Sequence, residues 1–169
     1  MDIEIIDNFM PKSVFGEFQN IFNEIPWYLI PVLQNPTCDP IHNFMFGHTF
    51  YVQHRPKSEL FSKYIEPLLS HMQVHSLIRV KANLTTRTEK IIKHGFHTDY
   101  IWNEEVKGND NCFAAILYIN TNNGYTEFKD GTKIESIENR LIKFPIYYEH
   151  TGTTCTDEPF RVNINFNYF

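Results

Sequence analysis

The chain has 169 residues, a formal net charge of −5 and 42% hydrophobic residues, which is enough for one domain with a sizeable core. The acidic balance argues against nucleic acid as an obligatory partner, because phosphate binding needs a basic surface. No stretch of the sequence reaches the ~18 consecutive apolar residues of a membrane-spanning helix, so no membrane partner is expected.

The N-terminal segment predicts a short strand followed by one amphipathic helix. Ile3–Ile6 is a brief apolar run that favours a strand. Pro11 then begins a helix and Pro26 ends its pattern. The apolar residues between them recur at helical spacing and form one stripe: Val14, Phe15, Phe18, Ile21, Phe22 and Ile25. We expect this stripe to pack into the core.

A strand and a second helix are predicted next. Phe44–Val52 is rich in aromatic residues and favours a strand. Ser58 is a suitable N-cap for a helix that Pro67 would kink or shorten. One face of this helix is apolar: Leu60, Phe61, Tyr64, Ile65, Leu68 and Leu69. The two helices are expected to cover one face of a sheet.

From Ile78 onward the sequence predicts strands and turns. The candidate strands are Ile78–Thr85, His94–Asp99, Phe113–Asn120, Thr126–Phe128, Arg140–Phe144 and Phe160–Tyr168. Asn123-Gly124 and Asp130-Gly131 predict tight turns. Many short strands without helices between them favour a sandwich or a double-sheet jelly roll. We expect one domain over 1–169, with 1–76 as N-terminal support and 77–169 as the β core.

Three residues form a candidate metal site. His97 and Asp99 lie two residues apart in a predicted strand, so their side chains point the same way. His150 follows a strand-like segment and supplies a third candidate ligand. Two histidines and one carboxylate that leave coordination positions open are typical of non-haem Fe(II) oxygenases. A lone histidine in a strand is more often structural, so the hypothesis depends on the joint pattern. His94, three residues before His97, would be an extra ligand only if the strand bulges, and we expect it to be exposed.

These motifs carry a resemblance to a known family. The stretch from about Ile78 to Phe169 resembles the catalytic half of the 2-oxoglutarate/Fe(II) oxygenases of the prolyl-4-hydroxylase-like type, and it is especially similar to the small versions from tailed phages and marine microbes. The matching segments, in the family's order, are Phe96–Asp99, Ile116–Asn120, Asn123–Phe128, Asn139–Phe144, His150–Gly152 and Arg161–Phe166.

The resemblance implies a mainly β fold with flanking N-terminal helices, a double-stranded β-helix of the jelly-roll or cupin-like kind. It implies Fe(II) as metal, with 2-oxoglutarate and O2 as cosubstrates. The implied reaction hydroxylates an unactivated C–H bond of a peptide or small molecule and releases succinate and CO2. Prolyl hydroxylation of a peptide is the family default, although fold-level analogy is a poor guide to substrate.

Such an enzyme must also bind the distal carboxylate of 2-oxoglutarate. Arginine suits this role, because its planar fork pairs with both carboxylate oxygens. Arg161 opens the last predicted strand, and an antiparallel return would bring it beside His150. Asn163 and Asn165 share its face of that strand. Lys143 is a weaker candidate that we expect to face solvent.

The resemblance suggests further cosubstrate contacts from Asn83 and Tyr118. Leu117 stands where some relatives carry another tyrosine, so one hydrogen bond is missing or is supplied elsewhere. The polar segment Tyr100–Asn111 contains a glycine and is a candidate lid over the substrate. Trp27-Tyr28, together with the aromatic residues of that lid segment, would either line a substrate cleft or belong to the core.

Other functions remain open at this point. A cupin-like zinc or manganese hydrolase predicts no dependence on 2-oxoglutarate and leaves Arg161 unexplained. A non-catalytic metal-binding β-barrel module would bind metal without turnover. A demethylase of nucleic-acid bases is disfavoured by the acidic chain.

The cysteines give an expectation about compartment. Cys38, Cys112 and Cys155 are odd in number, far apart and form no CxxC pair, so neither a disulfide framework nor a zinc knuckle is expected. Cys155 is near His150 but is a weak ligand candidate, because thiolates more often bind zinc or Fe–S clusters. A reducing cytoplasm is the expected location, that of the host if a phage encodes the chain.

Overall fold

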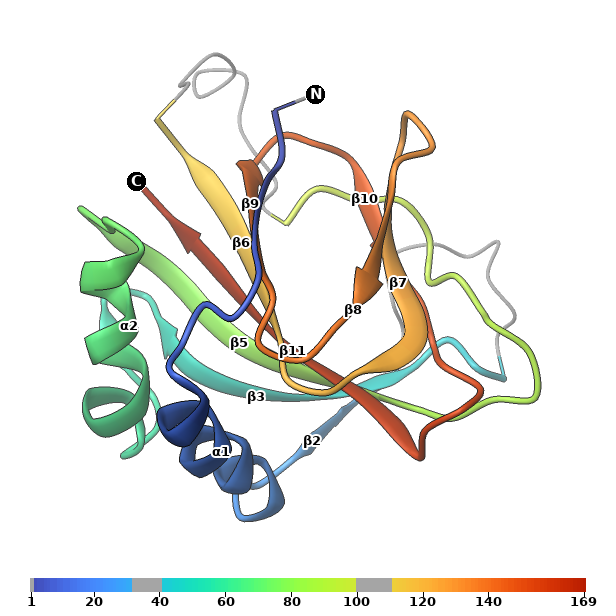
Figure 1. Cartoon of the computed structure of the whole chain (residues 1–169), viewed down its shortest axis with the longest axis horizontal. Coiled ribbons are helices and arrows are strands. Elements are labelled where there is room, and N and C mark those ends of the chain that lie inside the picture. Colours follow the sequence, from blue (N-terminus) through green and yellow to red (C-terminus); the bar gives the residue numbers. More distant parts are fainter. Residues whose placement is uncertain (1, 32–40, 100–110) are drawn as a thin grey trace.

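The computed structural model describes residues 2–31, 41–99 and 111–169. Its strands are β1 (Glu4–Ile6), β2 (Tyr28–Ile30), β3 (Met45–Val52), β4 (Arg55–Pro56), β5 (Leu77–Thr86), β6 (Phe113–Tyr118), β7 (Asn122–Phe128), β8 (Lys133–Ser136), β9 (Leu141–Pro145), β10 (His150–Gly152) and β11 (Phe160–Tyr168). They form two antiparallel sheets (Figure 1). The larger has the order β1-β9-β6-β11-β5-β3-β2, with β4 paired to β3, and the smaller has the order β10-β7-β8.

Both predicted helices are present and lie together on one side of the larger sheet (Figure 1). The first is α1 (Lys12–Asn20), which continues into a 3-10 turn over Ile21–Asn23. The second begins as a wide turn over Phe61–Ile65 and becomes α2 (Glu66–His71). Pro67 lies in the first turn of α2, where a missing N–H costs no hydrogen bond. The proline therefore marks the change from wide turn to α-helix.

The larger sheet has an apolar face that packs against the helices. On β11 this face presents Val162, Ile164 and Phe166, all buried. Val80 and Ala82 of β5 belong to the same core cluster. The helices contribute Phe15, Phe18 and Ile21 from the first and Phe61, Ile65 and Leu68 from the second. Burial of this face is the principal source of stability for the β11–β5 pair.

The opposite face of the larger sheet packs against the smaller sheet. A second apolar cluster fills one part of this space, with Phe128 from β7, Ile134 from β8 and Phe144 from β9. In the other part, alternate positions of β5 and β11 carry polar side chains: Arg79, Lys81, Asn83, Thr85, Arg161, Asn163 and Asn165. Side chains alternate with period two along a strand, so the residues that face the helices are apolar while their neighbours line a polar cavity.

Two local predictions were wrong. His94–Asp99 is not a regular strand, and only isolated bridges tie this region to the chain after β9, Lys93 to Thr153 and His97 to His150. Gly95 at φ 95° is the physical reason, because this conformation breaks the extended path. Asn123-Gly124 is not a turn between strands either. It lies inside β7, where the pairing with β8 shifts register between Asn122 and Tyr125.

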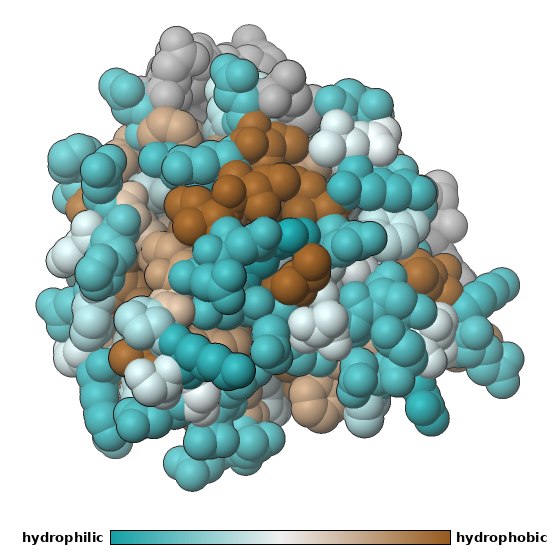
Figure 2. Space-filling view, viewed as in Figure 1, coloured by the Kyte–Doolittle hydropathy of each residue, from teal (hydrophilic) through white to brown (hydrophobic). Residues whose placement is uncertain are grey.

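Figure 2 shows one face of the molecule with an apolar patch over the region of β1. Ile5 on this strand is 50% exposed. β1 is an edge strand of the larger sheet and pairs only with β9 among the described strands. Its short length and the charge of Glu4 limit pairing with other chains. No helix in the described ranges is long and apolar enough to cross a membrane.

Candidate active site

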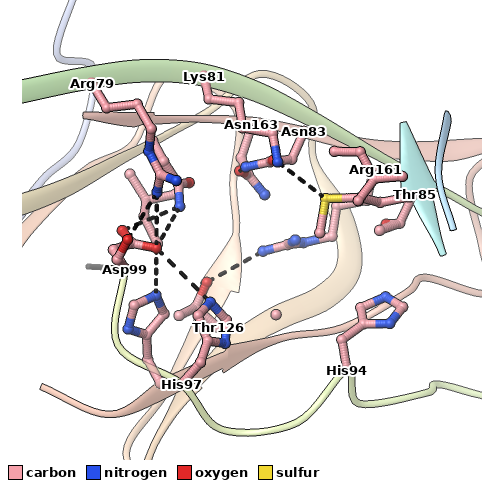
Figure 3. Close-up of a pocket in the computed structure, with 16 residues that line it drawn as sticks. Arg79, Lys81, Asn83, Thr85, His94, His97, Asp99, Thr126, Arg161 and Asn163 are labelled. Atoms are coloured by element: carbon pink, nitrogen blue, oxygen red, sulfur yellow. Dashed lines mark hydrogen bonds and ion pairs between the residues drawn. The ribbon is translucent and has the colours of Figure 1, made fainter. Parts of the chain in front are cut away.

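A cavity of about 230 Å³ opens between the two sheets. It holds the three candidate metal ligands at one end, with Arg161 reaching in from β11 (Figure 3). Thr126 of β7 and Gly152 of β10 line the smaller sheet's side, and Ile30 and Met45 line the mouth near β2 and β3. Ligand sites of this kind combine a small concave space with a few convergent polar groups.

His97, Asp99 and His150 converge as the sequence suggested. One potential ligand atom from each lies within 4.8 Å of the others. His97 Nε2 is 3.9 Å and His150 Nε2 is 3.8 Å from Asp99 Oδ1. The antiparallel bridge between His97 and His150 holds the two rings together, with reciprocal N–H···O bonds of 2.9 Å. The group therefore has the donor set and spacing of a small metal site.

Backbone carbonyls orient both imidazoles. His97 Nδ1 lies 3.1 Å from the Gly95 carbonyl oxygen, and His150 Nδ1 lies 3.0 Å from the Tyr148 carbonyl oxygen. A carbonyl only accepts, so each Nδ1 carries the proton and each Nε2 keeps a free lone pair. Desolvation lowers the pKa of His97, which favours the neutral ring that binds metals. The site is thus arranged to present two Nε2 donors.

Asp99 is held by three partners from neighbouring strands. Asn167 Nδ2 donates to Oδ2 at 3.0 Å, and Asn165 Nδ2 lies 3.4 Å from both oxygens. Arg79 Nη2 is 3.7 Å from Oδ1. Burial alone would raise the pKa of Asp99, but the field of His150 and Arg79 and the Asn167 hydrogen bond outweigh it and lower the pKa. Asp99 is therefore ready to bind a cation without first losing a proton.

Arg161 is 3% exposed and has no acidic partner in the described part of the chain. Its Nη2 donates to Thr126 Oγ1 at 3.3 Å, while its buried Nε has no hydrogen-bond partner there. Gly124 lies directly behind it, since an added Cβ would come within 2.7 Å of Arg161 Cδ. Desolvation lowers the pKa of this guanidinium. A buried cation with unused donors indicates a missing anion.

The other predicted cosubstrate residues fall into two groups. Asn83 and Asn163 are direct partners across β5 and β11, joined at 3.3 Å, and both line the cavity. Tyr118 is fully buried and lies behind the wall, where its hydroxyl donates to Thr126 Oγ1 at 2.8 Å. Its ring also packs 5.5 Å from Arg161 Cζ. Tyr118 is therefore placed to position Thr126 and Arg161 rather than to contact a ligand.

His94 was expected to be exposed, and that was wrong. It is 5% exposed, lines the cavity, and neither ring nitrogen has a hydrogen-bond partner among the described residues. Desolvation, with the charge of Arg161, lowers the pKa of His94 to about 4, so the ring is neutral. Its unused nitrogens are further hydrogen-bonding capacity inside the cavity.

Several site residues escaped the sequence analysis. Thr126, Arg79 and Lys81 all line the cavity. The available signal was the run of polar residues at alternate positions of β5, which is unusual for a strand in the middle of a sheet.

The remaining candidates lie elsewhere. Lys143 packs over the Phe113 ring at 4.3 Å and is absent from the cavity lining, and Cys155 donates to the Glu158 carbonyl at 3.4 Å outside the ligand group. Trp27 packs against the helix-side core. The predicted lid, Tyr100–Asn111, lies outside the described residues except for Asn111.

Solved structures share this architecture. A 2OG-Fe(II) oxygenase family oxidoreductase from Burkholderia pseudomallei superposes with a TM-score of 0.71 at 11% identity, covering 98% of this chain and 84% of that one. A Pseudomonas putida prolyl-4-hydroxylase gives 0.65 at 12% identity, with 98% and 91% covered. HygX from Streptomyces hygroscopicus, with nickel and 2-oxoglutarate bound, gives 0.63 at 9% identity, with 98% and 82% covered.

The chain has the double-stranded β-helix fold. The fold class predicted from the sequence is thereby confirmed. No family model matches the sequence, and no curated protein is similar enough in sequence to count as a relative. At such low identities the likeness concerns the fold, so activity must be argued from the site.

Proposed function

We propose that this protein is an Fe(II)- and 2-oxoglutarate-dependent oxygenase. The observation that carries the proposal is the content of one cavity, which joins a His-Asp-His triad to a buried arginine that has no acidic partner among the described residues. The triad suits a divalent metal and the arginine suits a carboxylate. A dicarboxylate that also chelates metal would satisfy both ends. HygX, which shares the fold, contains nickel and 2-oxoglutarate.

The chemistry of the donor set fits Fe(II). His97 and His150 would bind it through Nε2, and Asp99 through a carboxylate oxygen. One carboxylate and two imidazoles leave a divalent iron with residual positive charge and with open positions. The amides of Asn165 and Asn167 hold the Asp99 carboxylate in place, as partners of metal-binding groups commonly do.

The opposite wall of the cavity fits the distal carboxylate. Arg161 would pair with it through the unused Nε and a terminal nitrogen. The Thr126 hydroxyl accepts from Tyr118 and Arg161, which leaves its own hydrogen free to donate to the same carboxylate. The cavity volume of about 230 Å³ is small, and it suits a short dicarboxylate.

In the proposed reaction the protein's own residues chiefly orient the cosubstrate and exclude water. Fe(II), when bound, supplies the redox chemistry by which O2 oxidises 2-oxoglutarate to succinate and CO2 and a substrate C–H bond to an alcohol. Arg161 and Thr126 fix the cosubstrate at its distal end, so that its keto acid faces the triad. The buried imidazole of His150 and the buried carboxylate of Asp99 would keep bulk water away from a metal held there.

The proposal is tested by anaerobic reconstitution with Fe(II), followed by exposure to O2 and measurement of succinate formed from 2-oxoglutarate. We expect succinate from the wild type and none from His150→Ala. Pools of peptides, amino acids and nucleotides, added separately, then report which class increases the rate. The matched control is Lys143→Ala, which changes a residue outside the cavity.

Two other functions predict different outcomes. A non-catalytic metal-binding module would bind metal and form no succinate. A zinc or manganese hydrolase would gain no affinity for 2-oxoglutarate from the metal. Buried Arg161, which has no acidic partner among the described residues, favours the oxygenase over both, because neither alternative gives it a role. Peptide or small-molecule substrates and a cytoplasmic location stay predictions.

A further inference from the structure

Lys81 is a cation of the cavity that the proposed oxygenase reaction does not use. It lies on β5 between Arg79 and Asn83, on the face that lines the cavity. Its side chain extends toward Met45 on the neighbouring strand β3, with Nζ 3.9 Å from Met45 Sδ (Figure 3). Gly47 makes room for it, since a Cβ at that position would come within 2.7 Å of Lys81 Cε. The absence of a side chain at Gly47 therefore gives the Lys81 side chain a defined place in the cavity wall.

The ammonium of Lys81 lacks a compensating charge. Among the described residues it makes no ion pair, and the sulfur of Met45 is a weak acceptor. Burial, with the nearby charge of Arg79, lowers the pKa of Lys81 to about 8, against a smaller opposing effect of Asp99. A partly buried ammonium without an anion is an unfavourable arrangement.

The charges of the whole cavity also leave Lys81 without a compensating anion. Its lining has three basic side chains, Arg79, Lys81 and Arg161, and one acidic side chain, Asp99. Divalent iron and the dianion of 2-oxoglutarate would cancel each other's charge. Arg79 already lies against Asp99, and Arg161 would pair with the cosubstrate. Lys81 then remains as the cation without a partner.

Lys81 also lies at the junction of the cavity and a second, larger groove. A neighbouring groove of about 730 Å³ shares two lining residues with the cavity, Lys81 and Ile30. This groove runs past Tyr28 and Thr49 at the edge formed by β2 and β3. A molecule that extends from the metal into the groove must therefore pass Lys81.

We propose that the primary substrate carries an anionic group, a carboxylate or a phosphate, that pairs with Lys81 Nζ at the junction of cavity and groove. This inference rests on the proposed function, because it assigns Arg161 to the cosubstrate. The pair fixes one end of the substrate, so that a neighbouring C–H bond faces the metal. Uncharged analogues that lack the anion bind more weakly.

The test follows Lys81 and Met45 by NMR in protein labelled with 13C and 15N at lysine and at the methionine methyl group. The protein is loaded with diamagnetic Zn(II) and 2-oxoglutarate. Acetate, inorganic phosphate and the neutral acetamide are titrated separately. We expect acetate or phosphate to shift the Lys81 and Met45 signals saturably and acetamide to leave them unchanged. The anion that binds more tightly identifies the substrate's group.

Variants make the result specific. In Lys81→Gln the response of the Met45 methyl group should require about 10-fold more anion, or disappear. The exposed control Lys12→Met should behave as the wild type. Unchanged signals with both anions, or an equal response in Lys81→Gln, would overturn the inference. If 2-oxoglutarate alone saturates the Lys81 shift, the lysine binds the cosubstrate and the inference is also wrong. Failure of 2-oxoglutarate to bind the Zn(II) protein would instead reject the proposed function.

Discussion

Replacement of Arg161 by alanine is the sharpest test of the cosubstrate assignment. The guanidinium is 3% exposed, and it donates a hydrogen bond to Thr126. It contacts none of the three candidate metal ligands through a hydrogen bond or ion pair. Arg161→Ala should therefore remove the partner of the distal carboxylate while the triad keeps its geometry. Metal affinity is expected to stay within about 2-fold of the wild type.

The expected loss follows from the surroundings of the guanidinium. Removal of one partner from a buried charge pair costs about 2–5 kcal/mol. The Thr126 hydroxyl would still donate one neutral hydrogen bond, which contributes about 0.5–1.5 kcal/mol. We therefore expect a loss of about 3 kcal/mol, or roughly 100-fold in affinity for 2-oxoglutarate. Arg161→Lys keeps the charge but not the fork, so it should recover only part of this loss.

The assay is calorimetric titration of 2-oxoglutarate into protein loaded with Mn(II), which replaces the oxidisable Fe(II). Wild type, Arg161→Lys and Arg161→Ala are compared at one pH and ionic strength. Mn(II) binding is measured separately for each protein as the control. Equal affinities for 2-oxoglutarate in all three proteins would refute the reasoning and remove the main support for the cosubstrate.

Three further predictions concern other parts of the site. Asp99→Ala should abolish Fe(II) binding at neutral pH, and electron paramagnetic resonance of added Mn(II) would expose retained binding. Gly124→Ala should weaken 2-oxoglutarate binding about 10-fold by displacing Arg161, because the new Cβ would lie 2.7 Å from its Cδ; Gly16→Ala, which meets nothing within 4 Å, is the matched control. Anion binding at Lys81 should weaken as pH rises through about 8, since the amine then loses its proton; the charged groups that act on its pKa are Arg79 and Asp99. An NMR titration of acetate at several pH values that shows constant affinity would contradict this.

The strands that carry strong alternation were predictable from the sequence. Phe160–Tyr168 was predicted with the bounds that the structure has, because apolar and polar residues alternate along it. β5 differs from its prediction by one residue at each end. β8, β10 and β2 were not predicted, since three or four residues are too few to show a period. Their pairing is decided by partners distant in sequence.

His94 shows why the motif alone gave an incomplete list of the residues that line the cavity. Side chains alternate between the two faces of a strand, so the sequence argument placed His97 and Asp99 on one face and His94, three residues before His97, on the other. Gly95 at φ 95° interrupts that period, so His94 and His97 both line the cavity. A glycine two residues before a candidate ligand was the available signal. Its φ could not be inferred without the bridge from His97 to His150.

Asn123-Gly124 shows the same limit for a turn signal. Asparagine followed by glycine is common in two-residue hairpin turns, and the prediction followed that preference. In the structure Gly124 is instead a point of close approach, where the side chain of Arg161 and the carbonyl of Thr154 leave no room for a Cβ. The glycine of this dipeptide thus makes room for the Arg161 side chain of β11. Only tertiary contacts distinguish this use of glycine from a turn.

The polar face of β5 and β11 is itself an argument for a ligand. Both strands lie inside the larger sheet, and their other face is an apolar core. Apolar residues on both faces would bury surface without leaving donors unpaired, and buried donors without partners reduce stability. Yet the cavity retains the Nε of Arg161, the ring nitrogens of His94 and the ammonium of Lys81 without acidic partners in the described residues. A polar, anionic ligand that contacts a metal would satisfy these groups together, whereas a purely structural role explains none of them.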